Sequence, residues 1–173
     1  GPKVRRQFLD WGVFHVEPRF VDHWRRYQRA LRQRTAALRT GQAPQLVRAW
    51  DPELLEAAEI VASHRERYLA RLRAAVGSVG QRLLGLQIDL GLSRGWSAER
   101  TLHEALEASF ARDRERGLTH AGPHRADILV RVDGHRPGES GAAAAAGRTE
   151  VPRGTRQIWP SDIIGRYFIS GIP

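Results

Sequence analysis

The sequence predicts an α+β fold that is mainly helical, with long antiparallel helices and a few short strands. Apolar residues recur at helical spacing over residues 18–39 and again over 51–84. Apolar and other residues alternate in two shorter segments, 86–92 and 128–132, as in half-buried strands. The 173 residues suffice for one domain with a core of its own.

The first helices follow from local start signals and periodicity. Pro2 suits the first turn of a helix, whose apolar surface would comprise Val4, Phe8, Leu9 and Trp11 and which we expect to end near Gly12. Pro18 opens a second helix. The buried positions expected in that helix are Phe20, Trp24, Tyr27, Leu31 and Leu38.

A third, long helix should begin at Asp51-Pro52-Glu53, where Asp51 is expected to act as the cap. Its apolar spacing continues to Leu83, with an interruption expected at Gly77 or Gly80. Because about ten residues connect it to the preceding helix, the two should pack antiparallel. Ser97 is expected to cap a further helix, and Asp133-Gly134 is a hairpin signal after the second strand.

Composition limits the class of protein. The hydrophobic fraction of 41% and the charged fraction of 27% are those of a globular domain. The absence of cysteine excludes disulfides and cysteine-ligated metals, and favours a cytoplasmic chain. We find neither an apolar run long enough for a membrane span nor a signal peptide in this sequence.

The net charge of +9 is concentrated near the start of the chain. Residues 1–50 hold 11 basic and 3 acidic residues, whereas residues 51–139 hold 13 and 14. Such a block is typical of a surface that binds polyanions, although a solvated helix face gives the same pattern. Arg25, Arg29, Arg32 and Arg39 would follow one flank of the second helix, and Arg5 and Arg6 add further candidates for DNA contact.

No catalytic or metal-binding motif stands out. A phosphate-binding P-loop needs a lysine, and the single lysine is Lys3. His120 and His124 are four residues apart, but Gly122-Pro123 separates them, so one helix cannot direct both at a metal. We therefore expect no enzymatic activity and no cofactor in this chain.

Three stretches, in order, resemble one family. PKVRRQFLDW, RYQRALRQRTAALR (with Thr35 where the family has Asn) and THAGPHRADILVRVDG are similar to motifs of bacterial RecF proteins, over roughly residues 2–139. The resemblance implies an ABC/SMC-type ATPase that uses ATP and Mg²⁺ in recombinational repair of DNA. The ATP-binding motifs of that family are not in this sequence, and residues 140–173 do not match it.

The resemblance implies that residues 1–139 form a helical arm (lid) domain with connections to an ATPase head, and that 140–173 are not an independent domain. The strand after GPHRAD would return toward the head, which places Gly122, Pro123, His124, Arg125 and Asp127 at the head–arm junction. His124 and Arg125 would either hydrogen-bond that junction or sense nucleotide or DNA directly. Two functions remain open. One is contact with double-stranded or gapped DNA. The other is an interaction arm that docks RecO- or RecR-type partners or mediates dimerisation, without direct DNA contact.

Overall fold

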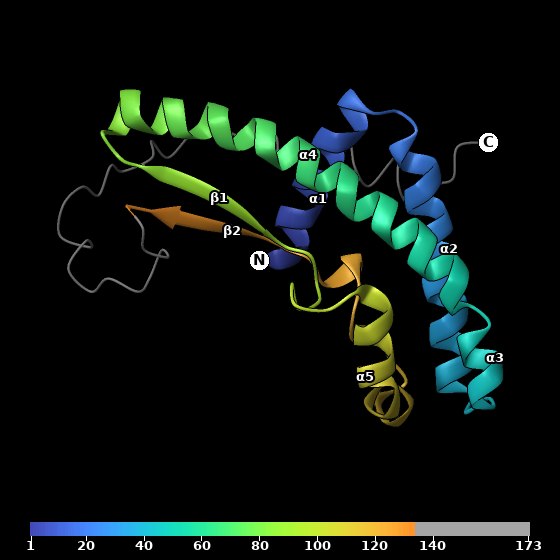
Figure 1. The fold of residues 1–173 in the computed structure, drawn as a ribbon. Helices are drawn as coiled ribbons and strands as arrows, with labels where there is room; N and C mark the ends of the chain where they lie inside the picture. Colours follow the sequence, from blue (N-terminus) through green and yellow to red (C-terminus); the bar gives the residue numbers. More distant parts are fainter. Residues whose placement is uncertain (134–173) are drawn as a thin grey trace, which may run out of the picture.

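The computed structural model describes residues 1–133, and the expected tail at 140–173 lies outside the described residues. The described part is mainly helical with one two-stranded antiparallel sheet, which confirms the predicted fold class (Figure 1). Its elements are α1 (Pro2–Val16), α2 (Phe20–Arg39), α3 (Pro44–Arg48), α4 (Asp51–Leu84), β1 (Ile88–Ser93), α5 (Leu102–Arg116), the 3₁₀ turn η1 (Pro123–Arg125) and β2 (Asp127–Val132).

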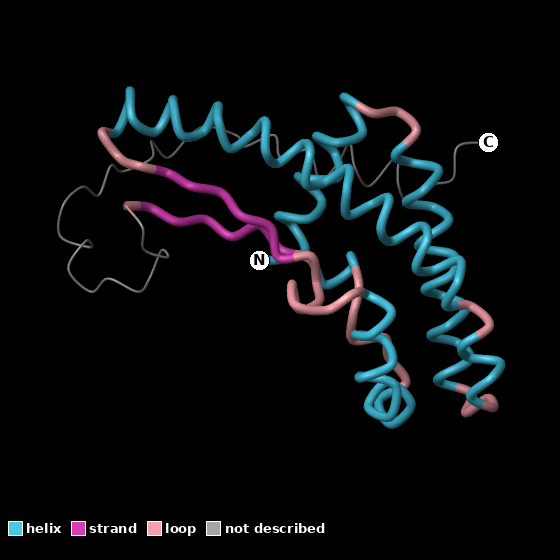
Figure 2. The backbone as a smooth tube through the Cα atoms, in the orientation of Figure 1, coloured by secondary structure: helices cyan, strands magenta, loops and turns pink. Residues whose placement is uncertain are grey.

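Helix α4 is the element on which the others are arranged. Helix α2 packs against its first half, as predicted from the connection length, and the sheet runs along its second half (Figures 1 and 2). The helix is continuous through Gly77 and Gly80, so the expected interruption is wrong. A Cβ on Gly80 would lie 2.8 Å from Ile88 Cδ1, so this glycine lets the strand approach the helix closely.

The core lies between α1, α2, α4 and the sheet. Its central side chains have almost no solvent exposure. They include Leu9, Phe20, Tyr27, Leu54, Val61, Leu102, Leu106 and Ile128. A smaller cluster joins the end of α2 to α3 through Leu38 and Val47.

The two predicted strands pair with each other. The register sets Ile88, Leu90 and Leu92 opposite Val132, Val130 and Ile128. Because side chains alternate along a strand, these six share the face on which the core lies. Helix α5 lies between the strands in the chain, so their pairing is not a tight hairpin.

Helix α1 differs from its prediction in length and in orientation. It does not end at Gly12 but continues to Val16. A Cβ at Gly12 would lie 2.3 Å from the ring of Tyr68, so the glycine serves instead to let α1 and α4 touch. Leu9 and Val13 are buried, whereas Val4 and Phe8, two residues of the expected apolar surface, are 52% and 43% exposed.

Two predicted caps are wrong. Helix α5 begins after Thr101, whose hydroxyl accepts from the N–H of Glu104 while the Glu104 carboxylate accepts from the N–H of Thr101. Ser97, the expected cap, accepts instead from the N–H of Glu99 in the preceding turn. Asp51 is the first helical residue of α4, and its carboxylate pairs with Arg34.

Within residues 1–133, the helices are all too short or too polar to span a bilayer.

A crossing between Gly95 and the GPHRAD segment should be intolerant of side chains. Gly95 has φ +98°, and a Cβ there would lie 2.1 Å from the carbonyl oxygen of Gly122. We expect Gly95→Ala to reduce the free energy of unfolding by about 3 kcal/mol or more, from the unfavourable φ and the backbone clash together. Urea unfolding measures this.

Gly85→Ala is the control, since Gly85 also has a positive φ, +65°, but has open space around its Cα. It should cost only about 1–2 kcal/mol, the price of the left-handed conformation alone. Equal losses in the two variants would show that the Gly95–Gly122 crossing is not tight in solution.

Candidate nucleic-acid interface and junction segment

The junction segment, residues 122–127, lies where α1, α2 and α4 converge. Gly122 has φ +138° and donates its N–H to the carbonyl of Gly95 over 3.2 Å. A Cβ at Gly122 would lie 2.6 Å from the hydroxyl of Tyr27, so only glycine fits both the conformation and the space.

Arg65 of α4 fixes the next residue of the segment. Its Nη1 donates to the carbonyl of Pro123 over 2.7 Å, while its Nε and Nη2 donate to both carboxylate oxygens of Asp10 over 2.7 and 2.9 Å. The Arg65 residue is only 3% exposed. One buried guanidinium therefore connects α4, α1 and the junction segment.

His124 is held as a neutral ring. Its Nε2 lies 2.9 Å from the carbonyl oxygen of Thr119, which can only accept, so Nε2 carries the proton. Its Nδ1 must then accept the hydroxyl proton of Tyr27 over 2.6 Å. Burial lowers the pKa of His124 to about 4, and burial raises the pKa of Tyr27.

Arg5 and Arg6, two predicted DNA contacts, have partners inside the molecule. Arg5 forms a two-pronged pair with Asp127 at 2.8 and 2.7 Å, and this hydrogen bonding lowers the pKa of Asp127. Arg6 donates to the carbonyl of Ala126 over 2.9 Å. Both therefore attach α1 to the junction segment, and Arg5 has little capacity left for another anion.

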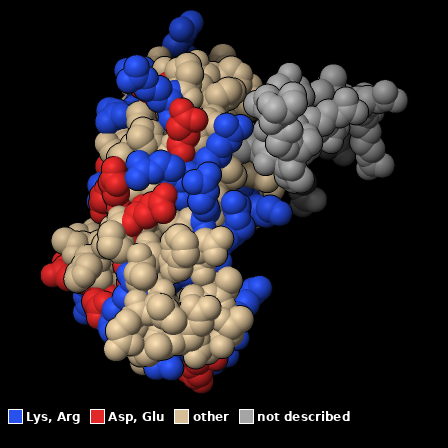
Figure 3. Space-filling model, turned by 90° about the vertical axis from the view of Figure 1, so that its right-hand side faces the viewer, with Lys and Arg blue, Asp and Glu red and all other residues tan. Residues whose placement is uncertain are grey.

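The outer arginine stripe, defined as Arg25, Arg29, Arg32 and Arg39, is exposed along α2. At 100° per residue it lies opposite the buried face that contains Tyr27 and Ala30, and not beside that face as expected. Within residues 1–133 no hydrogen bond or ion pair engages these four guanidiniums. Figure 3 shows the side of the molecule at the right of Figure 1, on which Lys and Arg side chains form a band with most acidic side chains to its left.

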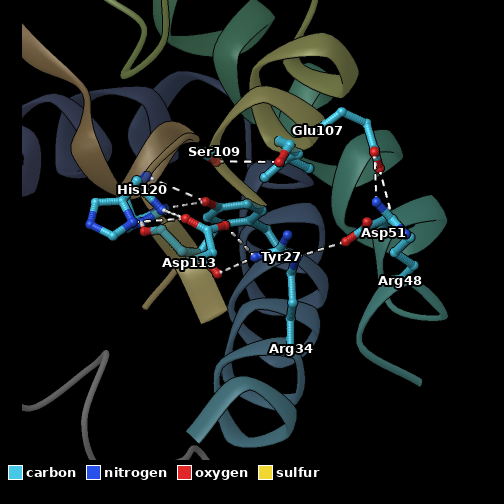
Figure 4. A network of polar contacts seen from close by, with 11 residues as sticks. Tyr27, Arg34, Arg48, Asp51, Glu107, Ser109, Asp113 and His120 are labelled. Carbon is cyan, nitrogen blue, oxygen red and sulfur yellow. Dashed lines mark hydrogen bonds and ion pairs between the residues drawn. The ribbon is translucent and has the colours of Figure 1, made fainter. Parts of the chain in front are cut away.

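Sequence reasoning missed a second buried guanidinium, that of Arg34, which is fully buried in α2 (Figure 4). Its Nε donates to Asp51 over 2.7 Å, and its Nη1 donates to Asp113 and Thr119 over 2.8 and 2.9 Å. His120 also bonds Asp113, over 2.7 Å. A signal was present in the sequence, because Arg34 lies seven residues after Tyr27 on the apolar face of the helix.

Comparison with known proteins shows what the chain is similar to in sequence and in fold. It is 48% identical over 141 residues to the DNA replication and repair protein RecF of Pseudomonas aeruginosa (strain LESB58), covering 80% of this chain and 38% of that protein. It is 50% identical over 136 residues to the same protein of Azotobacter vinelandii (strain DJ / ATCC BAA-1303), covering 78% and 37%. No protein-family model matches the chain.

Among solved structures, the fold matches the recombination mediator protein RecF-ATPrS in the RecFOR pathway. The TM-score is 0.74 at 20% sequence identity, over 79% of this chain and 40% of that one. A second RecF structure, with ATP, matches equally well.

In sequence and in fold, the chain is similar to one part of proteins described as DNA replication and repair proteins. In particular, the chain is homologous to a part of RecF, which confirms the resemblance seen in its motifs. It spans 38% of the length of the first of these relatives.

The neutral His124 predicts a specific pH dependence of stability. A histidine in the unfolded chain has a pKa near 6.5. Between pH 6.5 and 4 the unfolded chain therefore binds a proton that His124 in the folded chain does not bind. The stabilisation is complete above pH 6.5 and is lost as the pH falls to 4, by up to about 3 kcal/mol. His124→Gln keeps a donor for Thr119 without titrating, so its free energy of unfolding should fall less over this window.

Urea unfolding at pH 7, 5.5 and 4.5 measures the difference, and exposed His103→Gln is the control, whose curve should run parallel to that of the parent. If the His124→Gln curve is parallel to the parent as well, His124 is not held neutral in the folded chain.

Proposed function

We propose that this chain is a DNA-contacting arm of a RecF-type repair protein and that the outer arginine stripe meets the phosphates of double-stranded or gapped DNA. The observation that carries this is the exposure of four guanidiniums on one face of α2 without carboxylate partners among residues 1–133. Arginine on such a face is free to exchange counterions for phosphates.

The dimensions of the stripe fit a nucleic-acid backbone. At 1.5 Å per residue, Arg25 and Arg39 are roughly 21 Å apart along the helix. Duplex DNA carries about one charge per 1.7 Å of axis, so a stripe of this length meets several phosphates. Contacts of this kind position the protein on DNA without reading its sequence.

The wider role is inferred from the relatives, since the chain spans only part of them. Their description as DNA replication and repair proteins, and the RecFOR pathway of the matching structure, support a role in repair of single-strand gaps and recombinase loading in the cytoplasm. We propose that the arm, residues 1–139, acts there with the ATPase head and its Mg²⁺ and ATP. The junction segment would be the connection between arm and head.

A second function is favoured by an apolar groove between the end of α4 and β1. Its lining includes Val79, Leu83 and Ile88, and Leu83 is 77% exposed. Leucine exposed to this degree beside other apolar residues is typical of a docking surface. The alternative proposal is therefore an interaction arm that docks RecO- or RecR-type partners or a second copy, with the arginine stripe left in solvent.

We expect the isolated chain not to hydrolyse ATP, because its sequence lacks the lysine-containing loop that clamps phosphates in P-loop ATPases. Phosphate release from the purified chain should equal that of a mock preparation, with and without Mg²⁺ and DNA. Turnover that follows the chain through purification would contradict this expectation.

The stripe itself can be tested by replacing Arg25, Arg29 and Arg32 together with glutamine, which keeps helix propensity and removes three charges. Binding to duplex DNA should weaken by a similar factor for every sequence. The slope of log affinity against log salt should shrink by about 0.9 per lost contact, hence by roughly 2 to 3. Fluorescence anisotropy over a salt series measures both.

The matched control replaces exposed Arg71, Arg82 and Arg100 with glutamine, so both triple variants have the same net charge. If the two variants lose the same affinity and salt slope, binding follows net charge and not the stripe. If the stripe variant binds as the parent does, the interaction-arm function becomes the better proposal.

A further inference from the structure

Positive charge at the junction segment exceeds the negative charge that balances it. Four arginines and two carboxylates meet here, from α1, α4, η1 and β2. They are Arg5, Arg6, Arg65 and Arg125, with Asp10 and Asp127. Each carboxylate is fully used by one arginine, Asp127 by Arg5 and Asp10 by Arg65. Two guanidiniums, those of Arg6 and Arg125, remain without a counterion among the described residues.

Arg6 is partly withdrawn from solvent, among charges of both signs. It is only partly exposed, and its one hydrogen bond among the described residues goes from Nη1 to the carbonyl of Ala126. Burial lowers the pKa of Arg6, as do the charge of Arg65 and, least of all, that of Arg125, whereas Asp127 and Asp10 raise it. The remaining N–H groups of this guanidinium are therefore donors in a region of excess positive charge.

Arg125 is the one residue of GPHRAD whose side chain the fold leaves free. The other five have the internal contacts described above or are buried, as Ala126 is at 1% exposure. The backbone of Arg125 is fixed, since its N–H donates to the carbonyl of Gly122 over 2.9 Å. Its side chain is exposed, and within residues 1–133 no hydrogen bond or ion pair engages it. A rigid backbone therefore presents a free guanidinium on the residue next to Ala126, whose carbonyl accepts from Arg6.

We propose that Arg6 and Arg125 together bind a phosphate group at the junction segment. Phosphate supplies the negative charge that the site lacks and several acceptor oxygens, and the planar fork of a guanidinium matches its geometry. The group could belong to a nucleotide or to a nucleic-acid backbone, because the chemistry recognised is the same. This site is distinct from the outer arginine stripe, so it does not depend on the function proposed for α2.

Calorimetric titration of the whole 173-residue chain at low ionic strength tests the site with two probes, inorganic pyrophosphate and a single-stranded oligonucleotide. Arg125→Gln should weaken binding of the effective probe at least tenfold. Arg125→Lys keeps the charge but loses the planar fork, so its affinity should lie between those of the parent and Arg125→Gln. Arg82→Gln removes an equal charge from an exposed position of α4 and should bind as the parent does.

The two probes distinguish the source of the phosphate. Saturable pyrophosphate binding that needs Arg125 supports a nucleotide phosphate, and oligonucleotide binding alone that needs Arg125 supports a nucleic-acid backbone. The Arg25, Arg29 and Arg32 triple variant should retain pyrophosphate binding. Arg125→Gln should lower the affinity for the oligonucleotide further when it is added to that triple variant, which separates this site from the stripe. Failure of both probes overturns the proposal, as does an equal loss in Arg125→Gln, Arg82→Gln and the triple variant.

A thermal measurement gives an independent readout. Without phosphate at low salt, Arg125→Gln should raise the melting temperature, because it removes repulsion with Arg6, and the gain should fade as salt screens the charges. Pyrophosphate should raise the melting temperature of the parent more than that of Arg125→Gln. A variant that is less stable than the parent at low salt would show that Arg125 has a structural partner, and would overturn the proposal.

Discussion

Two guanidinium groups withdrawn from solvent, those of Arg34 and Arg65, are the constraint on which the rest of this structure depends. Removing a charge from water costs several kcal/mol per ion unless well-placed partners replace the solvent. Here the partners come from elements far apart in the sequence: Asp10 lies 55 residues before Arg65, and Asp113 lies 79 after Arg34. The helices must therefore assemble in one arrangement, because any other leaves a buried charge without a partner.

The two networks meet at the junction segment, which explains its unusual composition. Arg65 holds the carbonyl of Pro123, and Arg34 holds the hydroxyl of Thr119, whose carbonyl in turn receives the proton of His124. Tyr27 completes the connection by donating to His124. The conformation of residues 122–127 thus follows from the packing of α1, α2 and α4, and a displacement of any of these helices would be transmitted to it.

The sequence predicted the elements with strong periodicity, α2, α4 and both strands, because a repeating apolar pattern records which face is buried. It failed where one residue type serves two environments. The positions expected to be buried do not include Arg34 and Arg65, since arginine is seldom fully buried. Val4 and Phe8 belong to the apolar surface expected for α1 but are exposed, since α1 is too short for its pattern to distinguish two faces. Asp51 satisfied the rule for a cap, yet a tertiary partner claims its carboxylate.

The same limit applies to function, because composition counts arginines without separating them by environment. The guanidinium groups of Arg34 and Arg65 form buried ion pairs inside the fold, and that of Arg5 pairs with Asp127. Only guanidiniums that are exposed and unpaired can attract an external anion, and in residues 1–133 these include the α2 stripe and Arg125. The number of arginines available for binding is therefore smaller than their count in the sequence suggests. A uniform basic surface would hold any polyanion in many orientations, whereas a stripe on a rigid helix and a single guanidinium on a fixed turn restrict how one can lie.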